Sequence, residues 1–134
     1  MTDGVLVEYD AAAPEARAVF EEIARARGID PRAVNNFWKA MARHPGQMRR
    51  MWSNMTSVMG PGALDPLVKE MVYLAVSVTN DCAYCVASHT AQARRKGMSE
   101  AMFGELMAVV GLANETNRLA SGYRVPIDDI FMTP

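Results

Sequence analysis

Apolar residues recur every three or four positions along most of this chain, the spacing that places them on one face of an α-helix. Alternation of apolar and polar residues, which is typical of strands, is scarce. The pattern predicts an all-α fold of about six to seven helices around a single layer-packed core. Six of these helices cover about residues 14–28, 31–43, 47–59, 66–79, 82–96 and 100–113. Residues 114–120 either extend the sixth predicted helix or form a short seventh one.

Capping residues support these boundaries. Asp30–Pro31 and Asp65–Pro66 each combine an N-cap residue with proline in the first turn, which is typical of a helix start. Gly28 suits the position after a helix end, and Ser99 suits an N-cap. Either residue of the pair Asn80–Asp81 would cap the fifth helix. The caps therefore agree with the periodicity.

The predicted helices differ in how much of their surface is apolar. Met71–Val78 is apolar nearly all round, which indicates burial on several sides. The other helices carry single apolar stripes that would face the core. In the second, third and sixth helices these stripes consist of Val34, Phe37, Trp38 and Met41; of Met48, Met51, Trp52 and Met55; and of Met102, Leu106, Val109 and Val110.

The length of 134 residues suits one domain, residues 1–134, with an extended N-terminal arm over residues 1–12 and a tail over residues 122–134. A last turn is expected within residues 127–131. Half of the residues are apolar and 22% are charged, so long-range disorder is not expected. The composition predicts a folded domain.

Net charge, apolar runs and the start of the chain argue against a nucleic-acid-binding protein, a membrane-spanning protein and a secreted protein. The net charge is −1, which argues against a strongly basic nucleic-acid surface. The longest apolar run, Met71–Val78, has eight residues and includes a serine, far from the roughly 20 that span a bilayer. The acidic start of the chain lacks the positive region of a secretory signal. We therefore expect a cytoplasmic protein that binds neither nucleic acid nor membrane.

Most of the reactive side chains lie between residues 70 and 89. Cys82 and Cys85 are three residues apart on one helix face, with a Cα separation of about 5 to 6 Å that a disulfide tolerates. His89 lies one turn beyond Cys85, within reach of its thiol proton. Glu70, on the preceding helix, would orient His89 if the two helices pack antiparallel. These four residues are the candidate catalytic site.

The residues alone leave the attacking thiolate open. Cys82 lies in the first turn, where the helix dipole lowers the pKa of a thiol most strongly. Cys85 lies closer to the histidine that would take its proton. Chemistry therefore favours Cys85 if a general base is essential, and Cys82 if exposure and the dipole dominate.

The cysteine pair also has interpretations that involve no redox catalysis. Glu70, Cys82, Cys85 and His89 could form an unusual zinc site, although the usual second pair of ligands is missing. The cysteines could also be inert buried thiols or a structural disulfide. Elsewhere, His44 is expected at the C-terminal end of the second helix, and residues 94–96 read as a solvated cluster of cations at a helix end.

The spacing Glu-x11-Cys-x2-Cys-x3-His resembles that of the AhpD-like alkylhydroperoxidases of the carboxymuconolactone decarboxylase superfamily. Glu70, Cys82, Cys85 and His89 match that motif position for position. The resemblance covers roughly residues 64–128. One departure is Tyr84, which stands where some members carry a second histidine of the proton relay.

The resemblance implies an all-helical fold, assembly into homo-trimers or homo-hexamers, and reduction of hydroperoxides. It implies that Cys85 is the peroxidatic thiol, activated by His89 and Glu70, and that Cys82 is the resolving thiol. A lipoyl protein or a thioredoxin-like dithiol would reduce the disulfide, with no metal, flavin or nucleotide cofactor. The decarboxylases of the superfamily do not rely on this cysteine motif, so decarboxylation is a distant alternative.

Two other hypotheses stand beside the peroxidase. The pair could serve a general thiol–disulfide oxidoreductase or redox sensor with little peroxidase activity, because tyrosine at position 84 is a poor base at neutral pH. The chain could instead be a helical binding protein whose cysteines are inert or hold a metal. Reaction of the thiols with a hydroperoxide separates these three hypotheses.

Overall fold

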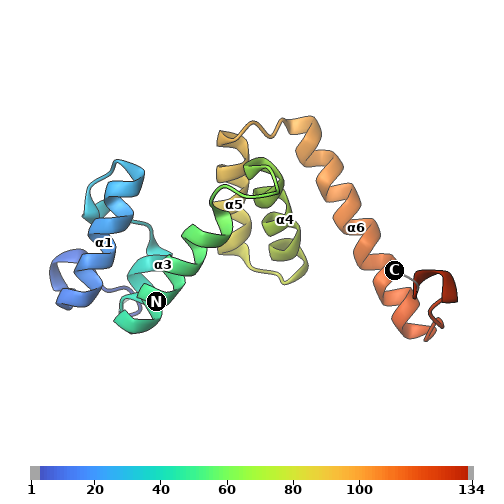
Figure 1. Ribbon diagram of the computed structural model, residues 1–134, viewed down its shortest axis with the longest axis horizontal. Helices are drawn as coiled ribbons and strands as arrows, with labels where there is room; N and C mark the ends of the chain where they lie inside the picture. Colours follow the sequence, from blue (N-terminus) through green and yellow to red (C-terminus); the bar gives the residue numbers. More distant parts are fainter. Residues whose placement is uncertain (1–3, 133–134) are drawn as a thin grey trace. The chain divides into compact units, whose positions relative to one another are not determined.

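A computed structural model describes residues 4–132, and this part of the chain contains helices and no strands (Figure 1). The predicted all-α class is therefore confirmed. The described helices also include three short 3₁₀-helices, η1 (Tyr9–Ala11), η2 (Pro31–Ala33) and η3 (Asp129–Phe131). The six α-helices are α1 (Pro14–Arg27), α2 (Asn36–Met41), α3 (Pro45–Met59), α4 (Pro66–Thr79), α5 (Ala83–Arg95) and α6 (Glu100–Gly122).

The chain divides into two compact units at Gly60–Pro61. Each unit has its own cluster of buried side chains. The prediction of one domain over residues 1–134, built on a single core, stays a prediction. Within the described residues, no helix combines the length and the apolar character needed to cross a membrane.

The first unit packs α1, α2 and α3 around large apolar side chains. Phe20, Trp38 and Met48 are fully buried at its centre. The apolar stripes predicted for the second and third helices contribute to this cluster. Within the predicted arm, residues 9–11 form η1 rather than an extended strand of chain, and the backbone N–H of Val7 donates to the carbonyl of Lys39. Residues 1–3 of that arm lie outside the described residues.

The second predicted helix is interrupted. Asp30 caps as expected, since its side chain accepts a hydrogen bond from the N–H of Arg32, but the helix it starts is only η2. Val34 and Asn35 are extended, and a new helix begins at Asn36. The prediction of one continuous helix from Pro31 was wrong because local capping does not fix helix length.

His44 begins a helix rather than ending one. Its Nδ1 accepts a hydrogen bond of 3.1 Å from the N–H of Gln47, and Pro45 is the first residue of α3. Proline is suited to this position because its missing N–H is not needed there. The expected role of His44 at a helix C-terminus was therefore wrong.

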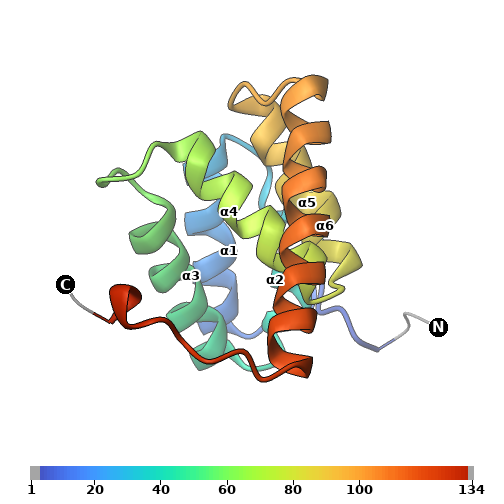
Figure 2. The same ribbon diagram turned by 90° about the vertical axis from the view of Figure 1, so that its right-hand side faces the viewer.

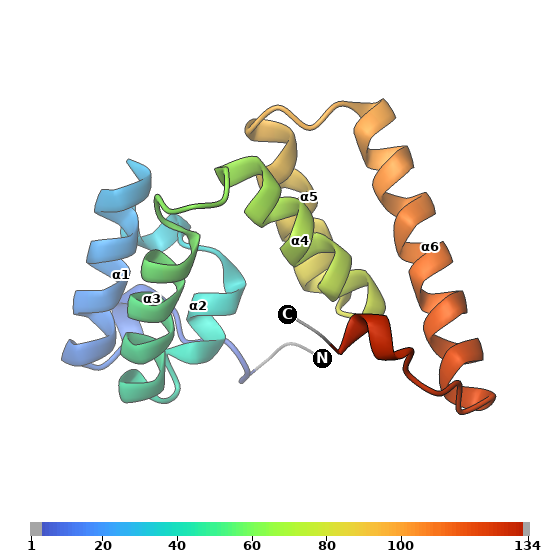
Figure 3. The same cartoon turned by 45° about the vertical axis from the view of Figure 1, so that its right-hand side comes forward.

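The second unit is built on α4 and α5, which are connected by a short turn and lie side by side (Figure 3). Leu74 of α4 and Ala93 of α5 are fully buried between them, and Met98 closes the cluster. The N-terminal half of α6 adds side chains at the edge of this cluster, Met102, Phe103, Leu106 and Met107. The caps predicted at Asp65 and Ser99 are present, with their side chains accepting from Leu67 and Met102.

Burial of α4 and α6 differs from the prediction. Leu74 is buried, but Val72 and Val76 are about half exposed in the described chain, so α4 is not covered on every side. On α6, Val110 is buried whereas Val109 is 61% exposed. The predicted stripe places both valines on one face of α6, so two neighbouring members of that face are covered to different extents. The sequence therefore overestimated how far these helices are covered.

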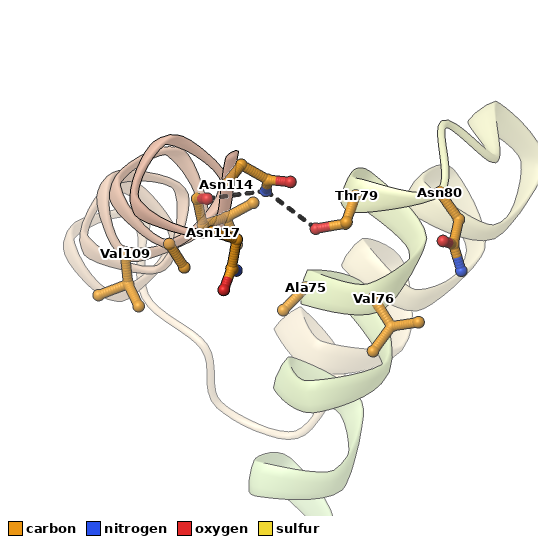
Figure 4. Close-up of a pocket in the computed structure, with 9 residues that line it drawn as sticks. Ala75, Val76, Thr79, Asn80, Val109, Asn114 and Asn117 are labelled. Atoms are coloured by element: carbon orange, nitrogen blue, oxygen red, sulfur yellow. Dashed lines mark hydrogen bonds between the residues drawn. The ribbon is translucent and has the colours of Figure 1, made fainter. Parts of the chain in front are cut away.

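α6 is a single helix of 23 residues, so residues 114–120 continue it (Figure 2). Asn114 donates from Nδ2 to Thr79 Oγ1 of α4, at 3.0 Å. A groove of about 260 Å³ lies between the two helices, and the close-up shows Asn114 and Thr79 pointing toward one another across it (Figure 4). The expected turn near the end of the chain is η3, and residues 133–134 of the predicted tail lie outside the described residues.

Candidate functional site

The turn between α4 and α5 fixes the first cysteine. Asp81 adopts a left-handed conformation with φ 57°, which aspartate tolerates better than most residues. The N–H of Cys82 then donates to the carbonyl of Ser77, and the N–H of Asp81 donates to that of Val78, at 3.0 and 3.2 Å. This bonding pattern is a Schellman motif, and it fixes Cys82 three residues after Thr79, the last residue of α4.

Cys82 is also the N-cap of α5. Its Sγ lies 3.3 Å from the N–H of Cys85, which donates to it. The expectation that Asn80 or Asp81 would cap this helix was wrong, because the Schellman turn uses both residues. The two cysteines form a disulfide with their Cα atoms 5.3 Å apart, as their spacing predicted. A sulfur at this position is exposed to the positive end of the helix dipole, which stabilises a thiolate in the reduced form.

The carboxylate of Glu70 is buried between α4 and α5, with 5% of its side chain exposed. Its Oε2 lies 2.7 Å from Nδ1 of His89, and its Oε1 lies 2.6 Å from Nζ of Lys96. His89 belongs to α5 and Lys96 is the C-cap of that helix, two turns further along the same face. The antiparallel arrangement thus brings Glu70 to His89, as the sequence predicted.

These contacts set the charge of Glu70. Burial alone would raise the pKa of this carboxyl, but the hydrogen bonds from His89 and Lys96, together with the positive charge of Lys96, hold its pKa below the ordinary value of 4.5. Glu70 is therefore an anion at neutral pH. An ionised carboxylate only accepts hydrogen bonds, so the hydrogen of the His89 ring resides on Nδ1 and Nε2 is left as the basic nitrogen.

Tyr73 stacks on one face of the His89 ring. The two rings are stacked with centroids 3.6 Å apart and an angle of 22° between their planes. Tyr73 lies three residues after Glu70 on α4, so one face of α4 supplies both the hydrogen-bond acceptor and the stacking partner. His89 is thereby fixed in position and in rotation, with 12% of its side chain exposed.

The four predicted residues form two pairs on one helical hairpin. One pair is Cys82 with Cys85 and the other is Glu70 with His89. Within residues 4–132, no hydrogen bond joins His89 to a sulfur. His89 nevertheless lies one turn along α5 from Cys85, and both cysteines are partly exposed. Tyr84, between the cysteines, is 43% exposed.

Sequence reasoning missed two residues of this arrangement, Lys96 and Tyr73. Lys96 was interpreted as part of a solvated cluster of cations, yet it binds the buried carboxylate. Its spacing of seven residues from His89 was a usable signal, since seven residues make two helical turns. Tyr73 had a comparable signal in its spacing of three from Glu70.

The zinc-site interpretation receives no geometric support. Among the described residues, no three histidine, cysteine, aspartate or glutamate side chains are arranged to hold a metal ion. The oxygens of Glu70 are bound by His89 and Lys96, and the two sulfurs are bonded to each other.

Comparison with known proteins identifies the family. The carboxymuconolactone decarboxylase family matches residues 45–127, which is more than half of the chain. The crystal structure of the alkylhydroperoxidase AhpD core from Rhodospirillum rubrum ATCC 11170 matches with a TM-score of 0.84 and 48% sequence identity, over 90% of this chain and 88% of that one. No curated protein matches. The resemblance found in the cysteine motif is confirmed, and the chain belongs to the carboxymuconolactone decarboxylase family as an AhpD-like member.

Proposed function

We propose that this protein reduces hydroperoxides with the thiols of Cys82 and Cys85. The observation that carries the proposal is the cysteine pair at the start of α5, one turn before a histidine that a buried carboxylate orients. The 48% identity to an alkylhydroperoxidase core over most of both chains supports the same chemistry. Glu70, His89 and the two cysteines are the proposed catalytic residues.

The first step oxidises one thiol. Nε2 of His89 takes the proton of Cys85, and the thiolate attacks the terminal oxygen of the hydroperoxide. The O–O bond breaks, Cys85 becomes a sulfenic acid, and the leaving alkoxide takes the proton back from His89 to become an alcohol. Glu70 stabilises the imidazolium that forms in this step, as the acidic member of a catalytic triad does.

The second step closes the disulfide. The Cys82 thiol attacks the sulfur of the sulfenic acid, the Cys82–Cys85 bond forms and water leaves. A dithiol donor then reduces the disulfide by exchange and is itself oxidised. We propose a lipoyl protein or a thioredoxin-like protein as this donor. Since the cycle needs a reducing compartment, we propose that the protein works in the cytoplasm.

A thiol count tests the cycle. The reduced protein is mixed with one equivalent of cumene hydroperoxide, and free thiols are counted over seconds. We expect two thiols per chain to disappear and a dithiol to restore them. Cys85→Ser should retain its remaining thiol, whereas Cys82→Ser should lose one thiol and accumulate a sulfenic acid that a dimedone probe traps.

The chain offers a matched control for the base. It has two histidines, and His44 caps α3 in the first unit. His89→Gln should slow thiol oxidation, whereas His44→Gln should leave its rate unchanged. Equal rates in wild type, Cys85→Ser and His89→Gln would contradict the mechanism.

A second candidate function is general thiol–disulfide exchange. Tyr84 favours it, because this exposed phenol stands between the cysteines where some relatives carry a second histidine. In that case the reduced protein would exchange with a disulfide reagent but leave cumene hydroperoxide intact. Tyr84→His would then be expected to raise the rate with the hydroperoxide.

We also propose that the protein assembles as a homo-trimer or homo-hexamer. Aliphatic side chains on α4 and α6 are more than half exposed in the single chain, which is the kind of surface that oligomers cover. Light scattering coupled to gel filtration measures the mass of the assembly, and a monomer at micromolar concentration would contradict the proposal. The residues concerned are Val72, Val76, Val109 and Leu112.

A further inference from the structure

Glu70 has one partner for each of its oxygens, and the two partners differ in charge. A neutral His89 donates a hydrogen bond to Oε2 but contributes no net charge. Lys96 contributes a full positive charge at 2.6 Å from Oε1. A buried carboxylate stays ionised only where hydrogen bonds and opposite charge compensate its lost hydration. While His89 is neutral and able to act as a base, Lys96 is therefore the cation that balances Glu70.

The backbone around Lys96 holds it in place for this contact. Lys96 is the C-cap of α5, and Gly97 follows with φ 108°, a conformation that glycine adopts without strain. The turn closes when the N–H of Met98 donates to the carbonyl of Ala93, and both of these residues are buried. Side chains on a helix tilt toward its N-terminus, which directs Lys96 back toward His89 and Glu70.

The other cations at this end of α5 are placed differently. Arg94 forms an ion pair with Glu100 at 3.0 Å, and Arg95 is exposed. From α5 and its C-cap, the charged or titratable groups that face Glu70 are His89 and Lys96. On α4 itself, Tyr73 stacks on His89, and the Nζ of Lys69 lies near Gly62 in the preceding loop.

We infer that Lys96 is a positioning residue of the proposed redox site: it binds Oε1 of Glu70 so that Oε2 remains an anionic acceptor for His89. Lys96 touches neither sulfur nor substrate in this role and acts through Glu70. The inference rests on the proposed function for its effect on thiol chemistry, but the ionisation of Glu70 can be measured without any turnover.

The test compares variants in the disulfide form by carbon-13 NMR of the Glu70 carboxyl group, assigned with Glu70→Gln. Lys96→Met removes the charge and keeps most of the side-chain length. We expect its Glu70 titration midpoint to rise by about one unit, because a nearby cation favours the carboxylate. Lys96→Arg should restore the midpoint to near that of wild type. Arg95→Met, the same loss of charge one residue earlier, should leave it unchanged.

A second readout follows the reduced protein. In the pH–rate profile for thiol oxidation by cumene hydroperoxide, the rate falls toward low pH along the acid limb. The midpoint pH of this limb should rise by a similar amount in Lys96→Met and should stay unchanged in Arg95→Met. A purely structural role would change the rate without moving this limb. If Lys96→Met does not fold, Lys96→Gln replaces it, since it keeps a hydrogen-bond donor without the charge.

The outcomes separate the two proposals. An unchanged Glu70 midpoint in the folded, uncharged variant overturns the role of Lys96, whatever the activity. A raised midpoint in a protein whose wild type does not react with the hydroperoxide supports the role of Lys96 and overturns the peroxidase instead.

Discussion

Glu70→Gln tests whether the buried carboxylate stabilises the fold as an anion. Each hydrogen bond to a charged group contributes about 1.5–3 kcal/mol, and Glu70 makes two of them. Glutamine can still accept from His89, which retains about 1 kcal/mol, and it avoids the larger cost of burying a charge. Lys96, whose side chain is one-third exposed, can turn to solvent. We expect a net loss of about 2 kcal/mol in the free energy of unfolding at pH 7.

The loss should depend on pH in a defined direction. The pKa of Glu70 in the folded protein is below its ordinary value of 4.5, so the unfolded chain binds a proton more readily. The contribution of Glu70 to stability is therefore fully present above about pH 4.5 and declines as the pH falls through the folded pKa. The difference between wild type and Glu70→Gln should be smaller at pH 3 than at pH 7.

Urea denaturation followed by far-UV circular dichroism at pH 7, 5 and 3 measures this difference in the disulfide form. Glu105→Gln is the matched control, because it makes the same change at an exposed glutamate of α6. The control should stay within about 0.5 kcal/mol of wild type. A difference between wild type and Glu70→Gln that is constant or grows toward pH 3 would refute an anionic Glu70 held by His89 and Lys96.

Two further predictions concern the packing of the same unit. Leu74→Ala empties a fully buried position and should destabilise the protein by about 2–5 kcal/mol in urea denaturation; a change below about 1 kcal/mol would show that the cluster is not tightly packed. Tyr73→Leu removes the stacking on His89 and should slow thiol oxidation by about 2- to 10-fold, since an aromatic pair contributes about 0.5–1.5 kcal/mol. Tyr73→Phe keeps the ring and should react at the wild-type rate, and equal slowing in both variants would assign the effect to the hydroxyl instead.

Features that depend on a few neighbouring residues could be predicted from the sequence. The caps at Asp65 and Ser99 and the left-handed Gly28 are local, and all three are present. The spacing of Cys82 and Cys85 also fixed their Cα separation, because one helical turn has one geometry. Pairing of Glu70 with His89 needed one assumption about long-range structure, that α4 and α5 pack antiparallel.

Features that depend on competition between local signals were harder to predict. His44–Pro45 looked like a helix break, but the same two residues are an N-cap and a first-turn proline, and their role depends on which side the helix lies. Exposure of Val109 on α6 was missed for a different reason. Apolar periodicity tells which residues share a face, but it does not tell how much of a long helix another element covers.

Lys96 shows how charge balance extends such predictions. A cation in the last turn of a helix is favoured by the helix dipole, which is a sufficient reason for its presence in solvent. That explanation is incomplete once the preceding helix carries a buried carboxylate whose other partner is a histidine that, as the proposed base, must be neutral. Such a carboxylate needs a permanent cation, and in an antiparallel hairpin the cation must lie on the histidine's face of the second helix, a whole number of turns away. At seven residues from His89, Lys96 is the residue that meets both conditions, whereas Arg94 and Arg95 lie on other faces.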